Sequence, residues 1–356
     1  MIAEPVLLEM KNITKKYPGV TALNNVQFDL RKGEVHALVG ENGAGKSTLI
    51  KVLMGIEEKD EGSIVIRGNP VEIRNAQEAA GYKISSVFQE LSQIPYLSVG
   101  ENIFLGKEKY SFNLKRKKMI SETERLLEAY NIDLDPRAFI VDLPSAKCQL
   151  AEIMKAIAMK PEILILDEPT SSLTEDEARK LFTIIDTFKK RGIGIIYISH
   201  RMSELEEIAD RITVLRDGLY IDTKRMDEVS IHDVVTMMVG REVELYESAE
   251  GESIDYGAGE KVLEARGISK SGRFHDINFE LYRGEILGIA GLVGSGRSEL
   301  MNLLFGIDPI DSGEILLSGA PCEINNVQDA LAHKIAMIPE SRHQQGLVLM
   351  HSVEEN

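Results

Sequence analysis

The fold is decided by one stretch of sequence, Gly40-Glu41-Asn42-Gly43-Ala44-Gly45-Lys46-Ser47-Thr48. It matches the pattern G-x-x-x-x-G-K-[ST], which lies between a buried strand and a helix. The apolar run 35–39 precedes it and a helical pattern over 47–54 follows it. Glycines let backbone N–H groups approach phosphate oxygens, and the helix N-terminus adds partial positive charge. We therefore expect a phosphate-binding loop, with Lys46 on the β- and γ-phosphates and the Ser47 hydroxyl on Mg²⁺.

Two carboxylates end a second apolar run. Asp167 and Glu168 directly follow the run 163–166. Taken alone, Asp-Glu-Pro-Thr is more typical of a helix N-terminal cap. Beside a phosphate-binding loop, the first carboxylate holds Mg²⁺ through water, and the second polarises the water that attacks the γ-phosphate. We expect these two roles for Asp167 and Glu168.

Three further side chains lie where a nucleotide site would need them. His200 follows the apolar run 195–199, one strand–helix unit after Glu168, which predicts a γ-phosphate sensor. Gln89 also follows an apolar run, and we expect it to touch Mg²⁺ or the attacking water. Tyr17 is the candidate for stacking on adenine. Each has a plain structural alternative: a structural histidine, a surface glutamine and a half-exposed aromatic.

Apolar runs that alternate with helical patterns predict the fold class. The runs 35–39, 162–166 and 194–198 are each followed by polar residues and a helix. This order indicates an α/β fold with a mostly parallel, doubly wound sheet. Residues 115–157 are expected to be mainly helical, with breaks at Pro136 and Pro144.

The chain repeats itself. The stretch that starts at Gly55 recurs 251 positions later at Gly306, with Gly, Ile, Asp, Pro and Glu in the same order. Residues 242–260 carry seven acidic residues and no Lys or Arg, which favours a solvated linker or, alternatively, an acidic surface loop. We therefore predict one cassette over 1–241, with a helical subdomain at about 91–157, an acidic linker over 242–260, and the N-terminal part of a second, partial copy over 261–356.

Composition excludes several classes of protein. The 356 residues contain 43% hydrophobic and 28% charged residues, which is ordinary for a globular protein. No apolar run is long enough to span a membrane alone. The two cysteines form no disulfide framework and fit a reducing cytosol. The net charge of −16 argues against a nucleic-acid partner.

These motifs in this order resemble the nucleotide-binding subunit of an ABC transporter. Walker A corresponds to 40–47, the Q-loop to Gln89, Walker B to 163–167, the D-loop to 171–174 and the H-loop to His200. Within that family the phrases DEPTSSLTEDE, YISHRMSEL and MMVGRE are similar to ATPases that import ribose, galactose or methyl galactoside, xylose and arabinose. The resemblance implies a P-loop ATPase cassette that uses ATP and Mg²⁺. It also implies a peripheral position on the cytoplasmic face of a bacterial inner membrane, a membrane permease and a periplasmic sugar-binding protein.

The sequence departs from the family pattern in both copies. In the signature segment 143–149, Pro144 stands where the family has Ser and Ala146 where it has Gly. In the second copy Arg297, Glu299 and Glu340 replace the equivalents of Lys46, Thr48 and Gln89. Arg is no simple substitute for Lys in a crowded loop, and Glu299 adds a negative charge facing phosphate.

ABC cassettes resemble head-to-tail clamps, so these defects would fall in one inactive composite site. The site at 40–48 would need a signature from the second copy, and Asn356 comes before one would occur. We expect a second ATPase chain to supply it, or the chain to be a truncated product. Two alternatives stay open: a nucleotide-binding remnant without transport turnover, and a non-transport tandem-cassette ATPase. A GTPase is disfavoured because no N-K-x-D motif occurs.

Overall fold

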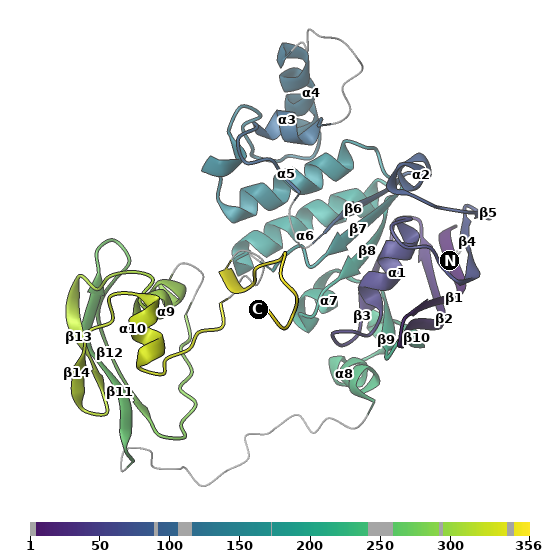
Figure 1. Ribbon diagram of the computed structural model, residues 1–356. Coiled ribbons are helices and arrows are strands. Elements are labelled where there is room, and N and C mark those ends of the chain that lie inside the picture. Colours follow the sequence, from purple (N-terminus) through teal and green to yellow (C-terminus); the bar gives the residue numbers. More distant parts are fainter. Residues whose placement is uncertain are drawn as a thin grey trace. The chain divides into compact units, whose positions relative to one another are not determined.

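The computed structural model describes residues 5–88, 92–105, 116–171, 173–240, 259–291, 295–339 and 345–356. The chain divides into two compact units, Met1–Leu245 and Tyr246–Asn356. Figure 1 labels the elements of both units, and each unit is described by itself. The predicted boundaries at 241 and 261 stay predictions.

A six-stranded sheet forms the centre of the first unit. Its strands run in the order β10 (Leu219–Arg225), β9 (Arg211–Arg216), β3 (Val35–Val39), β8 (Gly194–Ile198), β7 (Ile163–Asp167), β6 (Ile84–Val87). The pairs β9–β3, β3–β8, β8–β7 and β7–β6 are parallel, and β10 is an antiparallel edge strand. The predicted α/β class with a mostly parallel sheet is confirmed.

Both faces of this sheet are buried, and β7 shows how. Leu164 and Leu166 belong to the core that contains residues of α5 and α6. Ile163 and Ile165 point the other way, into the core that contains α1. This explains why the strand reads as an unbroken apolar run, the pattern of a parallel strand covered on both sides.

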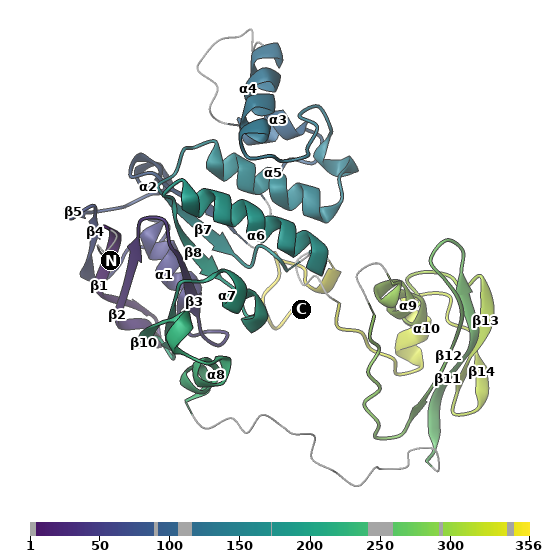
Figure 2. The same cartoon turned by 180° about the vertical axis from the view of Figure 1, so that it is seen from behind.

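A second, antiparallel sheet covers the far side of α1 (Lys46–Leu53). Its order is β2 (Val20–Arg31), β1 (Val6–Tyr17), β4 (Glu61–Ile66), β5 (Asn69–Val71). Both views place α1 between the two sheets, with α5 and α6 on the opposite face of the parallel sheet (Figures 1 and 2). The phosphate-binding loop therefore begins a helix that packs against both sheets.

Helices make up most of the remaining described part of the first unit. The predicted break at Pro144 is present, because Pro144 precedes the first residue of α5 as its N-cap. The bounds are α2 (Ala76–Gly81), α3 (Val99–Ile103), α4 (Arg116–Ala129), η1 (Ile140–Asp142), α5 (Ser145–Ile157), α6 (Glu175–Lys190), α7 (Met202–Ile208), η2 (Met226–Glu228) and α8 (Ile231–Val239).

The second unit repeats the antiparallel part of the first. Its sheet has the order β12 (Phe274–Tyr282), β11 (Lys261–Lys270), β13 (Ser312–Leu317), β14 (Ala320–Cys322), with α9 (Arg297–Leu304) and α10 (Val327–Ala332). The equivalent of β3 differs. Residues 285–290 form no strand in the described structure, and Ile286 is 97% exposed where Val35 is buried.

Candidate nucleotide-binding and hydrolysis site

The stretch 40–48 follows β3 as predicted, with residues 40–45 as the connection and residues 46–48 as the first turn of α1. Its backbone needs glycine at two points. Gly40 has φ 156°, and a Cβ there would lie 2.3 Å from the backbone oxygen of Leu215. Gly45 has φ 101°, and a Cβ there would lie 2.7 Å from the backbone oxygen of Ala22. The loop is therefore held in shape by β2 and by the end of β9.

A change at Gly40 should be much more costly than one at Gly43. We expect Gly40→Ala to destabilise the chain by roughly 2–4 kcal/mol, because the new methyl group meets a backbone carbonyl that cannot move freely. Gly43 has φ 85° with no atom within 4 Å of its built Cβ, so Gly43→Ala should cost only about 1 kcal/mol of backbone strain. Urea unfolding measures both, and equal losses would contradict the crowding argument.

The N-terminus of α1 is suited to an anion. Gly45 caps it in the left-handed conformation without a side-chain hydrogen bond, and no acidic residue lies in the first turn. By contrast, α3, α6 and α8 each begin with a capping box that uses up amide donors. The first-turn amides of α1 and its partial positive charge therefore face the loop without a competing side-chain acceptor.

Lys46 lies across this loop. Its Nζ donates to the backbone oxygens of Gly40 at 2.6 Å and Glu41 at 3.0 Å. Burial lowers the pKa of Lys46, and the charges of Asp167 and Glu168 oppose that shift. The ammonium and the two predicted carboxylates thus share one electrostatic environment.

Asp167 ends β7 and Glu168 directly follows it, as predicted. Burial and the charge of Glu168 raise the pKa of Asp167, while Lys46 opposes the shift. Glu168 has φ 47°, a left-handed conformation that is uncommon for a residue with a side chain. Its amide donates to the backbone oxygen of Ile198 at 2.9 Å, which ties it to β8.

The raised pKa of Asp167 predicts how the free energy of unfolding depends on pH. A group whose pKa is raised by folding stabilises the fold at pH values below its unfolded pKa, and this contribution is lost as pH rises through the folded pKa. We therefore expect Asp167→Asn to be more stable than wild type at neutral pH by roughly 0.5–2 kcal/mol. The difference should disappear in acid, below the ordinary aspartate range. Urea unfolding at both pH values tests this, with the exposed Asp133→Asn as control; a less stable Asp167→Asn at neutral pH would contradict it.

The structure brings Glu168 and His200 together. His200 Nδ1 lies 3.0 Å from Glu168 Oε1. The imidazole is 67% exposed and the carboxylate 22%, so the pair faces outward from the end of the sheet. Both residues follow neighbouring parallel strands, β7 and β8, which explains the contact.

Tyr17 lies beside the phosphate-binding loop, within hydrogen-bond distance of Thr48. It ends β1, and burial and the charge of Glu57 raise its pKa, while a hydrogen bond with Thr48 lowers it. The ammonium of Lys15 lies 5.4 Å from the centre of its ring. The stacking role of Tyr17 stays a prediction. Gln89 lies outside the described residues; the strand before it, β6, ends with Val87 beside Leu166 of β7.

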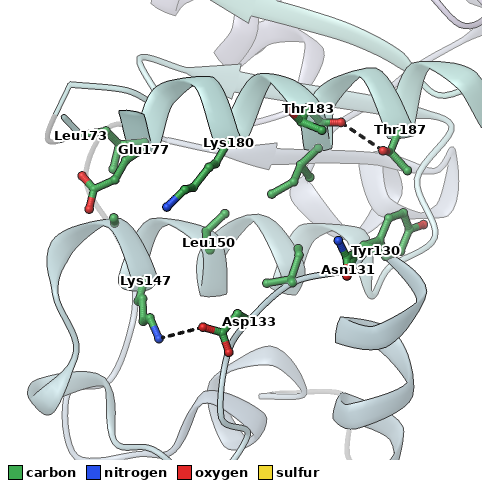
Figure 3. Close-up of a pocket in the computed structure, with 13 residues that line it drawn as sticks. Tyr130, Asn131, Asp133, Lys147, Leu150, Leu173, Glu177, Lys180, Thr183 and Thr187 are labelled. Carbon is green, nitrogen blue, oxygen red and sulfur yellow. Dashed lines mark hydrogen bonds and ion pairs between the residues drawn. The ribbon is translucent and has the colours of Figure 1, made fainter. Parts of the chain in front are cut away.

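The signature segment begins α5. Pro144 caps this helix with no side-chain hydrogen bond. A pocket of about 460 Å³ separates α5 from α6, with Leu150 and Leu173 in its wall (Figure 3). Lys147 Nζ is 3.6 Å from Asp133 at its rim. No residue of the predicted nucleotide site lines this pocket, so it is separate from that site.

The second copy of the loop differs from the first in its charges. Gly296 begins α9 with φ 89°, as Gly45 begins α1. Arg273 Nη1 lies 3.0 Å from Glu299 Oε1. The negative charge predicted to repel phosphate is therefore paired, which weakens that part of the argument against the second loop. Residues 292–294 and Glu340 lie outside the described residues.

Among the buried acids, the one that contacts the segments of Glu168 and His200 was not predicted. Glu204 of α7 is 6% exposed and accepts hydrogen bonds from Thr170, Tyr197 and Ser199. The sequence of α7, a short polar helix, does not indicate that one of its glutamates is buried.

Comparison with known proteins decides the family. A family model described as "ABC transporter" matches residues 23–171 and 274–356. The chain belongs to the ABC transporter family. A galactose/methyl galactoside import ATP-binding protein of Photobacterium profundum is 46% identical to this ABC protein over 99% of the chain and 70% of that protein. A ribose import ATP-binding protein of Geobacillus kaustophilus is 45% identical over 98% of the chain and 71% of that protein.

Solved structures agree with the family. The crystal structure of a nucleotide-free ATP-binding cassette from an ABC transporter matches this ABC protein with TM-score 0.60 and 25% identity, over 65% of this chain and 98% of that one. Among the described residues of the ABC chain, no helix has the length and apolar character that crossing a bilayer requires.

Proposed function

We propose that this chain is the ATP-binding and ATP-hydrolysing subunit of a bacterial ABC importer for a monosaccharide of the ribose or galactose class. The observation that carries the proposal is the electrostatic interaction of Lys46 in the loop with Asp167 and Glu168 at the end of the parallel sheet, where Glu168 also contacts His200 at 3.0 Å. The sugar class rests on the names of the relatives, which are 45% and 46% identical over nearly the whole chain.

Each residue of the site has a proposed role. The loop amides and the Lys46 ammonium bind the phosphates, and Tyr17 stacks on the adenine. Glu168 polarises the attacking water, and His200 contacts the γ-phosphate. Gln89 contacts the metal or the water. The residues proposed to bind ATP are Tyr17, Gly40, Glu41, Asn42, Gly43, Ala44, Gly45, Lys46, Ser47 and Thr48.

The residues present fit Mg²⁺. Mg²⁺ is usually held by one or two carboxylates together with substrate phosphates and water, and not by a cage of protein ligands. This agrees with the described residues, in which no group of three or more His, Cys, Asp or Glu is arranged to hold a metal. Ser47, Asp167 and Gln89 are the proposed ligands. When bound, the ion neutralises charge on the phosphates that Lys46 also contacts.

An exposed apolar patch supports a permease as partner. We define the patch as Ile94, Tyr96, Phe139 and Val141, with exposed fractions of 42, 78, 43 and 54%. Its two segments are held side by side, because the amide of Val141 donates to the oxygen of Pro95 at 3.0 Å. Exposed apolar side chains on adjacent segments are typical of interaction sites. We propose that a permease docks here and holds the chain at the cytoplasmic face of the inner membrane, with a periplasmic sugar-binding protein on the other side.

A nucleotide-binding protein without turnover is the second candidate function. The observation that favours it is Pro144 at the N-cap of α5, where it offers neither a hydroxyl nor an N–H to a phosphate. We propose that a second ATP-binding chain supplies the signature segment that the site at the loop 40–48 needs for hydrolysis. The two candidate functions predict the same binding of ATP and differ in hydrolysis.

The deciding experiment measures hydrolysis in the complex. The chain is co-expressed with a candidate permease, reconstituted in lipid nanodiscs, and assayed for ATPase activity with and without sugar-loaded binding protein. Stimulated turnover that Glu168→Gln abolishes supports the importer. ATP binding with no turnover in any of these settings supports the second candidate.

A further inference from the structure

The carboxylate of Glu204 is surrounded by donors. Thr170 Oγ1 lies 2.8 Å from each of its oxygens. The hydroxyls of Tyr197 and Ser199 donate to Oε2 at 3.0 and 3.1 Å. Arg201 Nη1 donates to Oε1 at 3.2 Å. Glu204, Thr170, Tyr197 and Ser199 are all buried.

Burying the Glu204 carboxylate lowers the stability of the fold unless hydrogen-bond donors and a positive charge replace its hydration. A buried carboxylate loses its hydration and is tolerated only when charged or hydrogen-bonding groups replace the lost water. Burial and the charge of Glu204 raise the pKa of Tyr197, so the phenol keeps its proton and remains a donor. The Arg201 guanidinium supplies the compensating positive charge at 3.2 Å.

The donors belong to the two segments that carry the reacting pair. Thr170 comes two residues after Glu168, and Ser199 directly precedes His200. Ser199 Oγ also accepts from the amide of Arg201 at 3.0 Å, which shapes the turn around His200. One carboxylate thus binds both of the segments that carry Glu168 and His200, which contact each other at 3.0 Å.

The backbone conformation of Glu168 depends on contacts that hold the segment in place. Its φ of 47° is unfavourable for a residue with a side chain and persists only where neighbouring contacts hold it. The bond from the Glu168 amide to Ile198 holds one side, and the Thr170–Glu204 bonds hold the other. Loss of the Thr170–Glu204 hydrogen bonds would let the segment around Glu168 move toward a more favourable backbone conformation.

We infer that Glu204 is a positioning residue that sets the separation and orientation of Glu168 and His200. It acts through Thr170 and Ser199, and no atom of it needs to touch nucleotide. This inference rests on the proposed function, in which Glu168 and His200 act at the γ-phosphate.

The test compares Glu204→Gln with Glu206→Gln in the reconstituted complex. Gln keeps the shape of the side chain but loses the charge and turns an amide donor toward hydroxyl donors. We expect Glu204→Gln to lower kcat by about 10²-fold, with KM and ATP affinity within about twofold of wild type. Glu206 is exposed on the same helix, and its variant should match wild type. An unchanged kcat in Glu204→Gln overturns the inference.

A second pair of variants separates positioning from general damage. Glu204→Gln in a background that carries both Glu168→Gln and His200→Ala should produce no further loss of kcat, since a positioning residue has no effect once both residues it positions are disabled. A purely structural role would lower ATP affinity and would reduce activity in both backgrounds, and that result overturns the inference.

Amide hydrogen exchange in the full chain distinguishes this inference from the proposed function. We expect the amides of Glu168 and Arg201 to exchange at least about tenfold faster in Glu204→Gln, while amides within β3 keep their wild-type rates. Should the wild-type complex show no turnover, the proposed function fails, and exchange still decides the positioning role. Unchanged exchange at both amides overturns the inference.

Discussion

Replacing Glu168 by Gln is expected to lower ATP turnover of the reconstituted complex by roughly 10²–10⁴-fold, the usual contribution of a general base. Gln matches Glu in size and can still contact His200, whose Nδ1 lies 3.0 Å from the carboxylate. The Gln amide cannot accept a proton from the attacking water, so ATP binding should persist while ATP hydrolysis stops. Steady-state ATPase rates and equilibrium ATP binding measure the two effects separately.

The matched control lies just before the same strand. Glu162 directly precedes β7, and its carboxylate contacts Arg67 and Lys83 on the surface, far along the strand from Asp167. Glu162→Gln removes one carboxylate from the same segment and should leave turnover within about twofold of wild type, since surface ion pairs contribute little. Equal losses in Glu162→Gln and Glu168→Gln would show that the charge of Glu168 has no special role.

Replacing Lys46 by Ala should weaken ATP–Mg²⁺ binding by about 10–100-fold. A hydrogen bond to a charged group contributes about 1.5–3 kcal/mol, and each 1.4 kcal/mol is a factor of ten in affinity. Titration calorimetry with a non-hydrolysable ATP analogue measures the change. The protein should remain folded, because removing a partly buried ammonium relieves the desolvation that lowers the pKa of Lys46.

Arg297→Ala is the internal control for Lys46→Ala. Arg297 begins α9 after Gly296, as Lys46 begins α1 after Gly45. We expect this change to leave affinity within about twofold, because the planar guanidinium does not replace a compact ammonium in such a loop. A large loss in Arg297→Ala together with none in Lys46→Ala would place the nucleotide in the second unit and overturn the assignment.

The sequence predicted the parts of the site that depend on neighbours in the chain. The strand at 35–39, the loop after it and the helix that begins within one residue of the predicted start are all local patterns. The sequence also placed Glu168 and His200 at the ends of apolar runs and beside the γ-phosphate, although their direct contact is a finding of the structure. Parallel strands end at one edge of a sheet, and this rule needs no knowledge of side-chain packing.

Contacts between distant residues could not be predicted in this way. Glu204 reads as a surface residue of a polar helix, and its burial depends on Thr170, 34 positions earlier. Glu299 reads as a repulsive charge, and its pairing with Arg273 depends on a fold that brings together residues 26 positions apart. Residues 285–290 likewise form no strand, although they align with β3 in the repeat, because strand formation depends on neighbouring strands as well as on local sequence.

The crowding around Gly40 and Gly45 has a thermodynamic consequence. Backbone oxygens of Leu215 and Ala22 lie so close that neither glycine has room even for a methyl group. A segment confined in this way has few conformations to give up when a ligand arrives, so the ordering entropy that weakens many flexible binding loops is largely absent here. Affinity for the triphosphate should accordingly depend on direct contacts with the ligand, and rigidifying changes elsewhere in the loop should add little to it.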